Sequence, residues 1–264
     1  MFEFHKNKEV YFNHQALNSK RYIIPFIEEK IKITPHMRVL EIGCAEGGVL
    51  KPFLEIGCFV FGVELDESKY NYFRTFLSNE IQEGKAKILN KNIYDIDVNA
   101  DLEGKFDIII LKDVIEHIHN QEKLLKELKL FLNPNGVIYF GFPPWQMPFG
   151  GHQQVCRSKF LSRFPYIHLL PFGIYEWLLK AFKENAETFI EIKETGISIE
   201  RFEKIVHSTG YKTIHKIHYL LNPIYTFKFN LRPIKQFFLI TKTPYFRNYL
   251  TTCVYYLIQN KRVN

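Results

Sequence analysis

The sequence has few cysteines, and their spacing argues against two kinds of small, cross-linked fold. The 264 residues include four cysteines, at positions 44, 58, 156 and 253, with no Cys-x-x-Cys pair among them. A disulfide framework or a zinc knuckle needs closer or paired spacing. We therefore predict four reduced thiols, as is typical of a protein of the cytoplasm.

Long apolar runs are missing as well. No stretch reaches the roughly 18 apolar residues that a membrane-spanning helix needs. The first residues, MFEFHK, lack the charged-then-apolar order of a secretory signal. Composition is otherwise that of a globular protein, with 46% hydrophobic and 24% charged residues, which excludes wholesale disorder. We expect one large domain with appendages, located in the cytoplasm.

Acidic residues are absent from the C-terminal part of the chain. The last one is Glu203, and the 61 residues after it carry ten lysines and arginines, whereas residues 1–203 carry 25 basic and 28 acidic residues. An acid-free, basic segment that is also rich in aromatic rings is a clue to binding partners.

The order of apolar segments predicts alternating strands and helices. Helical periodicity or composition is found in 13–33, 47–55, 67–82 and 121–132. Short apolar strands are predicted at 38–42, 59–63, 86–89, 106–111 and 137–142. Strands that are apolar throughout are typical of a parallel sheet covered on both faces. We therefore predict a doubly wound α/β fold, which binds ligands beyond the carboxyl ends of its strands.

Small residues follow the first predicted strand, and an acid follows the second. In Gly43-Cys-Ala45-Glu-Gly47-Gly48 the backbone can pass close to a ligand at the start of a helix. Glu64, 21 residues after Gly43, can accept hydrogen bonds from two ribose hydroxyls. Both features fit any adenosine-type cofactor. An NAD-dependent oxidoreductase is one interpretation, because Gly43-x-Ala45-x-x-Gly48 approximates its glycine loop.

A second interpretation is favoured by longer segments. The chain resembles the class I S-adenosylmethionine-dependent methyltransferases, nearest to those of the ubiquinone-biosynthesis type, over about residues 36–143 and more weakly over 197–230. The segments that carry the resemblance are VLEIGCAEGG (39–48), GVELDES (62–68), KFDIIILKDVIEHI (105–118) and LKELKLFLNPNGVIYFGFP (125–143). Glu41 agrees with it, because a carboxylate there would repel a pyrophosphate but suits a sulfonium and an ammonium group.

The resemblance implies a fold and a set of cofactor contacts. The fold is a mostly parallel seven-stranded sheet with a helical lid insertion and a C-terminal extension. The cofactor is S-adenosylmethionine, and the residues implied to bind it are Glu41, Gly43, Ala45, Gly47, Glu64, Leu65, Asn92, Ile93, Lys112, Asp113 and Val114. Two departures from the family pattern are Ala45, in place of a glycine, and Asn92, in place of an aspartate. The amide oxygen of Asn92 can still accept a hydrogen bond from an adenine amino group.

Methyl transfer needs an aligned acceptor and, for a hydroxyl acceptor, a base. We predict His117 and His152 as the catalytic residues. Asp113, Glu116 and His117 share one face of a helical turn, where they can hold a divalent cation or simply orient the loop; we expect no metal. Beyond the fifth strand, Trp145 and Phe149 either line the acceptor pocket with His152 or pack on one another.

Five segments are predicted along the chain: a helical lead (1–36), the cofactor-binding core (37–142), a lid insertion (143–196), the completion of the sheet (197–230) and a basic aromatic extension (231–264). The insertion is rich in bulky apolar side chains, which suggests a hydrophobic or amphipathic acceptor. We expect O-methylation of a small molecule, a lipid-like acceptor or a glycan. Methylation of RNA or protein, and a non-catalytic binding module with the same fold, are the alternatives.

The C-terminal extension has three interpretations. Residues 244–259 can form a helix with an aromatic face. Its rings can be buried in the core while its cations stay solvated, or they can rest on an anionic membrane surface, or they can bind RNA. Because no accessory RNA-binding module is recognisable, we expect no nucleic-acid partner, and keep peripheral membrane contact as a prediction.

Overall fold

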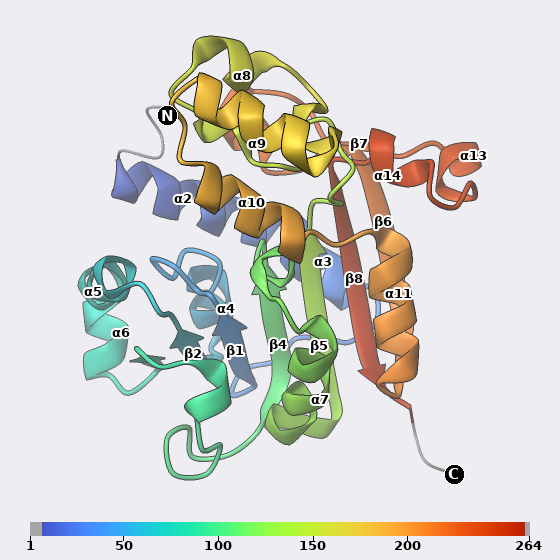
Figure 1. Ribbon diagram of the computed structural model, residues 1–264. Helices are drawn as coiled ribbons and strands as arrows, with labels where there is room; N and C mark the ends of the chain where they lie inside the picture. Colours follow the sequence, from blue (N-terminus) through green and yellow to red (C-terminus); the bar gives the residue numbers. More distant parts are fainter. Residues whose placement is uncertain (1–6, 262–264) are drawn as a thin grey trace.

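The computed structural model describes residues 7–261, and its strands form one sheet between layers of helices (Figure 1). The outermost residues of the predicted lead and extension, 1–6 and 262–264, lie outside the described part. The strands are β1 (Arg38–Ile42), β2 (Phe59–Val63), β3 (Ala86–Leu89), β4 (Phe106–Lys112), β5 (Leu132–Phe142), β6 (Tyr211–Leu221), β7 (Ile234–Lys235) and β8 (Cys253–Asn260).

The helices fall before, between and after these strands. They are α2 (Lys8–Asn18), α3 (Ile24–Glu28), α4 (Lys51–Ile56), α5 (Glu67–Phe76), α6 (Ser78–Gln82), α7 (Gln121–Phe131), α8 (Lys159–Arg163), α9 (Phe172–Ala181), α10 (Ala186–Thr195), α11 (Ile199–Ser208), α12 (Tyr225–Phe229), α13 (Phe238–Thr241) and α14 (Arg247–Leu250). A π-helical turn, Ser19–Ile23, joins α2 to α3.

The strand order is β3-β2-β1-β4-β5-β8-β6-β7. The pairs from β3 to β5 are parallel, whereas β8 is antiparallel to both of its neighbours. The doubly wound, mostly parallel sheet is therefore confirmed. It has eight strands instead of the predicted seven, because the two-residue strand β7 adds an outer edge beside β6.

The prediction for the C-terminal part of the chain is wrong in one respect. Residues 253–260 form an inner strand between β5 and β6, not the end of a helix over 244–259 or part of an extension outside the sheet. Tyr255 and Tyr256 are fully buried there, because adjacent strand residues point into opposite layers of the core. The sheet is thus completed by 211–221 and 253–260, and of the connection between them only the short strand β7 belongs to it.

Two apolar layers cover the faces of the sheet. On β4, Ile108 and Ile110 point into one layer, beneath α2, α3 and α4, and Ile109 and Leu111 point into the other, beneath α7 and α11. This alternation explains why the strand is apolar along its whole length.

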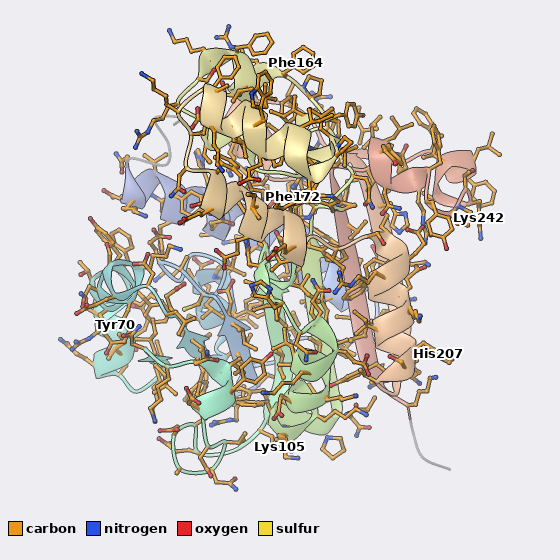
Figure 2. The ribbon with its side chains drawn as sticks, in the orientation of Figure 1. Tyr70, Lys105, Phe164, Phe172, His207 and Lys242 are labelled. Atoms are coloured by element: carbon orange, nitrogen blue, oxygen red, sulfur yellow. The ribbon has the colours of Figure 1, made fainter. Side chains whose placement is uncertain are left out.

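The predicted insertion forms three helices with a small core of its own. Leu161, Tyr175, Leu179 and Phe189 belong to this core, which is separate from the two main layers. The helices lie across the carboxyl ends of the strands (Figure 1), and Phe164 projects from their outer end (Figure 2). Gln121 ties the insertion to the sheet, since its amide donates to the carbonyls of residues 115 and 195. Among residues 7–261, no helix is long and apolar enough to cross a bilayer.

Candidate functional site

The loop after β1 is a tight turn whose glycines are required by its geometry. Gly43 and Gly47 have φ of +67° and +87°, a region that disfavours residues with a side chain. A Cβ at Gly43 would lie 2.6 Å from the side chain of Val114, and a Cβ at Gly47 would lie 2.6 Å from an aromatic ring of α5. Ala45 adopts φ +47° despite its Cβ, so the loop holds some strain at this residue.

Glu64 is fixed against the glycine loop by hydrogen bonds. Its Oε2 accepts from the Ala45 N–H at 2.9 Å, and its Oε1 accepts from the N–H groups of Leu65 and Asp66, both at 2.9 Å. A carboxylate has about four lone-pair positions, so these three bonds leave acceptor capacity while holding the group in place. The Gly43 N–H donates to the carbonyl of Val63, which joins the two strand ends directly.

A cavity of about 130 Å³ lies beside this loop. It is lined by Tyr11, Phe12, Gln15, Glu41, Gly43, Cys44, Ala45, Glu46, Gly48, Val49, Lys69, Lys112 and Asp113. The structure therefore brings together five of the predicted cofactor residues, Glu41, Gly43, Ala45, Lys112 and Asp113. Val114 shapes the cavity from behind through its contact with Gly43.

The residues predicted to meet the adenine lie outside this cavity. Leu65 is 66% exposed at the tip of β2, and Ile93 is buried in the core. Asn92 caps the turn that follows it, since its side chain accepts from the Tyr94 N–H at 3.1 Å. Asn90, which sequence reasoning missed, donates to the carbonyls of Glu64 and Leu65 and so fixes this strand tip. The adenine roles of Leu65, Asn92 and Ile93 stay predictions.

Two of the ionisable side chains that line the cavity, Glu41 and Lys112, are buried. Glu41 is buried, and its Oε2 has no hydrogen-bond partner among the described residues. Burial raises the pKa of Glu41 well above its ordinary value. Lys112 donates to Asp113, with Nζ 2.5 Å from Oδ2. Burial alone would lower the pKa of Lys112, but Asp113 raises it, so the pair is ionised.

The N-terminal helix forms the outer wall of the cavity, which the sequence did not reveal. Tyr11, Phe12 and Gln15 of α2 line it. A Cβ at Gly48 would lie 2.5 Å from the carbonyl oxygen of Phe12, so this glycine allows α2 to pack on the loop. The only signal in the sequence was the helical periodicity of the segment, which indicates a buried face but does not identify what it covers.

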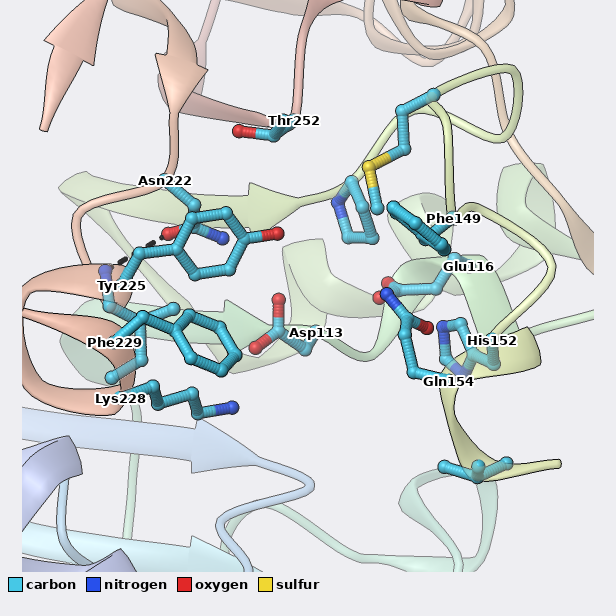
Figure 3. A pocket seen from close by; sticks show the side chains of 14 residues that line it. Asp113, Glu116, Phe149, His152, Gln154, Asn222, Tyr225, Lys228, Phe229 and Thr252 are labelled. Carbon is cyan, nitrogen blue, oxygen red and sulfur yellow. Dashed lines mark hydrogen bonds between the residues drawn. The ribbon is translucent and has the colours of Figure 1, made fainter. Parts of the chain in front are cut away.

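A second cavity, of about 270 Å³, opens beside the first. It is lined by Asp113, Glu116, Pro143, Met147, Phe149, His152, Gln154, Val155, Asn222, Ile224, Tyr225, Lys228, Phe229 and Thr252 (Figure 3). One part of the wall is apolar and aromatic, and the rest is polar and charged. Asp113 borders both cavities and lies near the centre of the view in Figure 3, between Lys228 and Glu116. A group bound in one cavity is therefore adjacent to a group bound in the other.

The two predicted catalytic histidines are adjacent, but only His152 lines the second cavity. The rings of His117 and His152 are edge to face, with centroids 5.0 Å apart. Burial lowers the pKa of His117, and burial together with the neighbouring His117 lowers the pKa of His152 to about 4. Both imidazoles are therefore neutral near pH 7. Glu116 lies beside them, and burial together with Asp113 raises its pKa well above the ordinary value.

The predicted cluster of Asp113, Glu116 and His117 is only partly formed. The Asp113 carboxylate is bonded to Lys112, whereas ligand atoms of Glu116, His117 and His152 lie within 4.8 Å of one another, close enough for a single ion to contact all three. Trp145 does not line the cavity. It packs on His168, with ring centroids 4.7 Å apart, so of the two predicted aromatic wall residues only Phe149 has that role.

Comparisons with known proteins agree on one family. The family described as a methyltransferase domain matches residues 12–165. A ubiquinone biosynthesis O-methyltransferase of Acinetobacter baylyi is 22% identical over 199 residues, which cover 75% of this chain and 77% of that protein. A thiol S-methyltransferase of Homo sapiens is 26% identical over 133 residues, covering 50% and 52% of the two chains.

A solved structure shares the fold. The magnesium protoporphyrin IX methyltransferase of Synechocystis PCC 6803, with bound SAH, is similar with a TM-score of 0.55. The similarity covers 96% of this chain and 86% of that one, at 12% identity, so it bears on the fold alone.

Proposed function

This chain belongs to the class I S-adenosylmethionine-dependent methyltransferases, and we propose that it methylates an oxygen of a small molecule, a lipid-like acceptor or a glycan. The observation that carries the proposal is the pair of cavities that meet at Asp113. The cofactor belongs in the first and the acceptor in the second. Because the chain is an enzyme, the non-catalytic alternative is set aside.

The first cavity fits the charges of the cofactor. Glu41, buried and with an unpartnered Oε2, is suited to receive the ammonium group of the methionine portion. Glu64 does not line the cavity but is bonded to Ala45 in its wall, and it retains about one acceptor position for a ribose hydroxyl while its other lone pairs hold the loop. The predicted contacts of Gly43 and Ala45 are supported by their place in the cavity wall, whereas those of Gly47 and Val114, which do not line it, stay predictions.

The second cavity fits a hydroxyl acceptor with an apolar body. S-adenosylmethionine, when bound, supplies an electrophilic methyl group on a sulfonium sulfur. As the acceptor O–CH₃ bond forms and the S–CH₃ bond breaks, the hydroxyl proton must leave. We propose that His117 and His152, neutral near pH 7, assist this loss. Phe149 and Tyr225 are placed to hold the apolar body.

The size of the second cavity favours a small acceptor over RNA or protein. About 270 Å³ lies just below the lower end of the range of small-molecule sites and is far too small for a folded macromolecule. Methylation of RNA or protein therefore remains the second candidate function, and it requires that a single base or side chain be extruded into this cavity. One relative is named as an O-methyltransferase and another as an S-methyltransferase, so experiment must decide whether the acceptor atom is oxygen or sulfur.

Calorimetry tests the cofactor site. We expect the wild-type chain to bind S-adenosylmethionine and SAH, and Glu64→Ala to lose most of that affinity, because both the ribose contact and the support of Ala45 are removed. Glu67→Ala, on the exposed start of α5, is the control. Undiminished binding by the Glu64 variant would contradict the site as drawn.

Transfer from ¹³C-methyl-labelled cofactor tests the acceptor. A panel of hydroxylated aromatics, thiols, glycans, lipid extracts and RNA is incubated with the enzyme, and the chemical shift of the transferred carbon identifies the atom that received it. Oxygen-bound label on a small or lipid-like acceptor supports the proposal. Label on sulfur, nitrogen or RNA alone rejects it.

We also propose a cytoplasmic enzyme that touches an anionic membrane surface. Trp177 of α9 is 66% exposed, and Phe238 and Leu239 of α13 are 70% and 78% exposed. Both segments lie at the end of the molecule where the parallel strands terminate (Figure 1). Cations accompany these apolar side chains: Arg157, Lys159, Arg163, Lys183, Lys235 and Lys242. Exposed aromatic rings with cations are suited to the interface of an anionic bilayer.

Vesicle flotation tests this contact. We expect binding to vesicles that contain phosphatidylglycerol, weaker binding to phosphatidylcholine alone, and loss of binding in the double variant Phe238→Ser with Leu239→Ser. Leu130→Ser is the control, because Leu130 is an exposed apolar residue of α7, away from this end of the molecule. Equal partitioning of the double variant and the wild type would reject the proposal.

A further inference from the structure

The wall of the second cavity carries a lysine that comes from outside the cofactor-binding core. Lys228, on α12, is the only lysine or arginine among the described residues that line this cavity, and it does not line the first. It belongs to the basic, acid-free part of the chain that follows Glu203. Its Nζ lies 5.6 Å from the centre of the Tyr11 ring, which lines the first cavity. The charge of Lys228 is therefore presented to the acceptor, close to the boundary with the cofactor.

Hydrogen-bond donors accompany Lys228 on the same side of the cavity. Burial raises the pKa of Tyr225 to about 12, so its hydroxyl keeps its proton and can donate. The Oδ1 of Asn222 accepts from the Ile224 N–H at 3.2 Å, which leaves the amide N–H groups as the side of Asn222 that a ligand can meet. Figure 3 shows the Lys228 ammonium and the Tyr225 hydroxyl directed toward the middle of the cavity. One cation with neutral donors beside it is suited to an anionic group.

The acids of the cavity do not cancel this charge. Asp113 is ionised but is paired with Lys112, whose Nζ lies 2.5 Å from its Oδ2. Burial together with Asp113 raises the pKa of Glu116 well above its ordinary value, which favours the uncharged form. Burial, with a smaller effect of Lys112, lowers the pKa of Lys228 to about 8, so Lys228 is mostly protonated near pH 7. An anion bound beside this cation would offset the cost of burying it.

We propose that the acceptor is a hydroxylated acid, and that Lys228, with Tyr225 and Asn222, binds its carboxylate or phosphate group. This inference rests on the proposed function for the identity of the second cavity as the acceptor site. Binding of the anionic group requires no methyl transfer, so it can be measured by itself.

The shape of the cavity sets the two ends of such an acceptor. In Figure 3, Lys228 and His152 lie on opposite sides of Asp113, the residue that borders both cavities. A hydroxyl beside Asp113 and His152 therefore places the anionic group toward Lys228, with the apolar body against Phe149. Lys228 holds the acceptor in this arrangement and takes no proton from it, so its charge selects the acceptor and fixes its orientation.

Calorimetry on the SAH-saturated protein tests the selection of acids. The probes are meta-hydroxybenzoate and meta-hydroxyphenylpropanoate, the amide of each, and meta-hydroxyphenyl phosphate. We expect the acids to bind at least about tenfold more tightly than the amides, because a charge-assisted hydrogen bond replaces a neutral one. The more tightly bound of the carboxylate and phosphate probes identifies the anionic group. Lys228→Met should abolish the preference for acids, and Lys228→Arg should keep most of it.

Lys212→Met is the matched control, since Lys212 is an exposed lysine on β6 that lines neither cavity. SAH binding shows that each variant is folded, because Lys228 does not line the cofactor cavity. Equal affinities for acids and amides, no binding of any probe, or a preference for acids that persists in Lys228→Met would overturn the proposal.

Steady-state kinetics separate binding from chemistry. With an acid acceptor, Lys228→Met should raise KM about tenfold and leave kcat within about twofold. A lost kcat with an unchanged KM would assign proton removal to Lys228 and overturn the role proposed here. A chain that prefers acids but transfers the methyl group to sulfur or nitrogen refutes the proposed function alone.

Discussion

The Lys8 ammonium lies 2.6 Å from Oε1 of Glu46, joining the first turn of α2 to the glycine loop. Glu46 is almost fully buried, and Lys8 is about one-third exposed. The contact spans two segments that are far apart in the sequence and places α2 over the cofactor cavity. We therefore expect cofactor binding to depend on the position of the N-terminal helix.

Removal of this ion pair should weaken cofactor binding. A partly buried pair contributes about 1 kcal/mol, or roughly fivefold in affinity. We therefore expect Lys8→Ala to raise the dissociation constant of SAH by about that factor in calorimetry. Lys20→Ala is the control, because Lys20 makes an exposed ion pair with Glu55 that does not border the cavity. Equal effects of the two changes would argue against a specific role for Lys8.

The strain at Ala45 predicts that a glycine is better tolerated there than the native residue. Left-handed φ costs a residue with a Cβ about 1–2 kcal/mol, and the extra freedom of glycine in the unfolded chain offsets part of that. Ala45→Gly should therefore stabilise the ligand-free protein by about 0.5–1 kcal/mol in urea denaturation. Gly47→Ala should destabilise it by about 3 kcal/mol, because strain and a 2.6 Å contact with Phe73 combine. A loss of stability in Ala45→Gly would contradict the inference that the backbone is strained at Ala45.

Acid should destabilise the packing of the insertion around His168. Its Nε2 lies 2.8 Å from the carbonyl oxygen of Trp145, and burial, with a smaller effect of Lys193, lowers the pKa of His168 to about 4. In the unfolded chain the pKa of His168 has its ordinary value near 6.5, so the unfolded chain binds a proton at a higher pH than the folded protein does. The free energy of unfolding therefore falls as the pH drops from about 6.5 to 4.

Protonation of His168 should lower the free energy of unfolding by up to about 3 kcal/mol over that pH range. In His168→Gln, whose amide can still donate to the Trp145 carbonyl, the melting temperature should depend less on pH between 7 and 4. His207→Gln, at an exposed position on α11, should show the wild-type dependence. Identical pH profiles of wild type and His168→Gln would refute the prediction.

Arg247 should be needed for the stability of the connection between β6 and β8. Its guanidinium donates to Glu200 at 2.9 Å and to Glu203 at 2.8 Å, which ties α14 to α11. Arg247→Met removes the mostly buried cation that Glu200 and Glu203 share, although Glu200 keeps its bond from Asn248 and Glu203 keeps its ion pair with Lys216. We therefore expect a loss of about 2 kcal/mol in chemical denaturation. Arg201→Met, at an exposed position of α11, should change stability by less than about 0.5 kcal/mol.

The central strands and the cofactor loop were predictable because their signals are local. The strands 59–63 and 86–89 have the predicted bounds, and Gly57 ends α4 in the left-handed conformation expected of a helix stop. Gly43 and Glu64 lie together, as the order of strand tips required. Each of these features depends on a few consecutive residues and on the rule that parallel strands end at one edge of a sheet.

Residues 244–260 could not be assigned in the same way. Their apolar and aromatic side chains are compatible with either a helix or a strand, and only the gap between β5 and β6 selects the strand. Likewise, the sequence could not show that Lys112 would form an ion pair with Asp113. Nor could it show that Glu116 would lie close to both His117 and His152.

The sequence by itself determined the family, the cofactor and the open edge of the sheet where chemistry occurs, because glycine turns and strand-tip acids are properties of short segments. Tertiary structure decided the rest: that α2 encloses the cofactor, that β8 completes the sheet, and that His152 faces His117. These are contacts between distant segments, and their geometry is fixed only when the apolar layers on both faces of the sheet pack together.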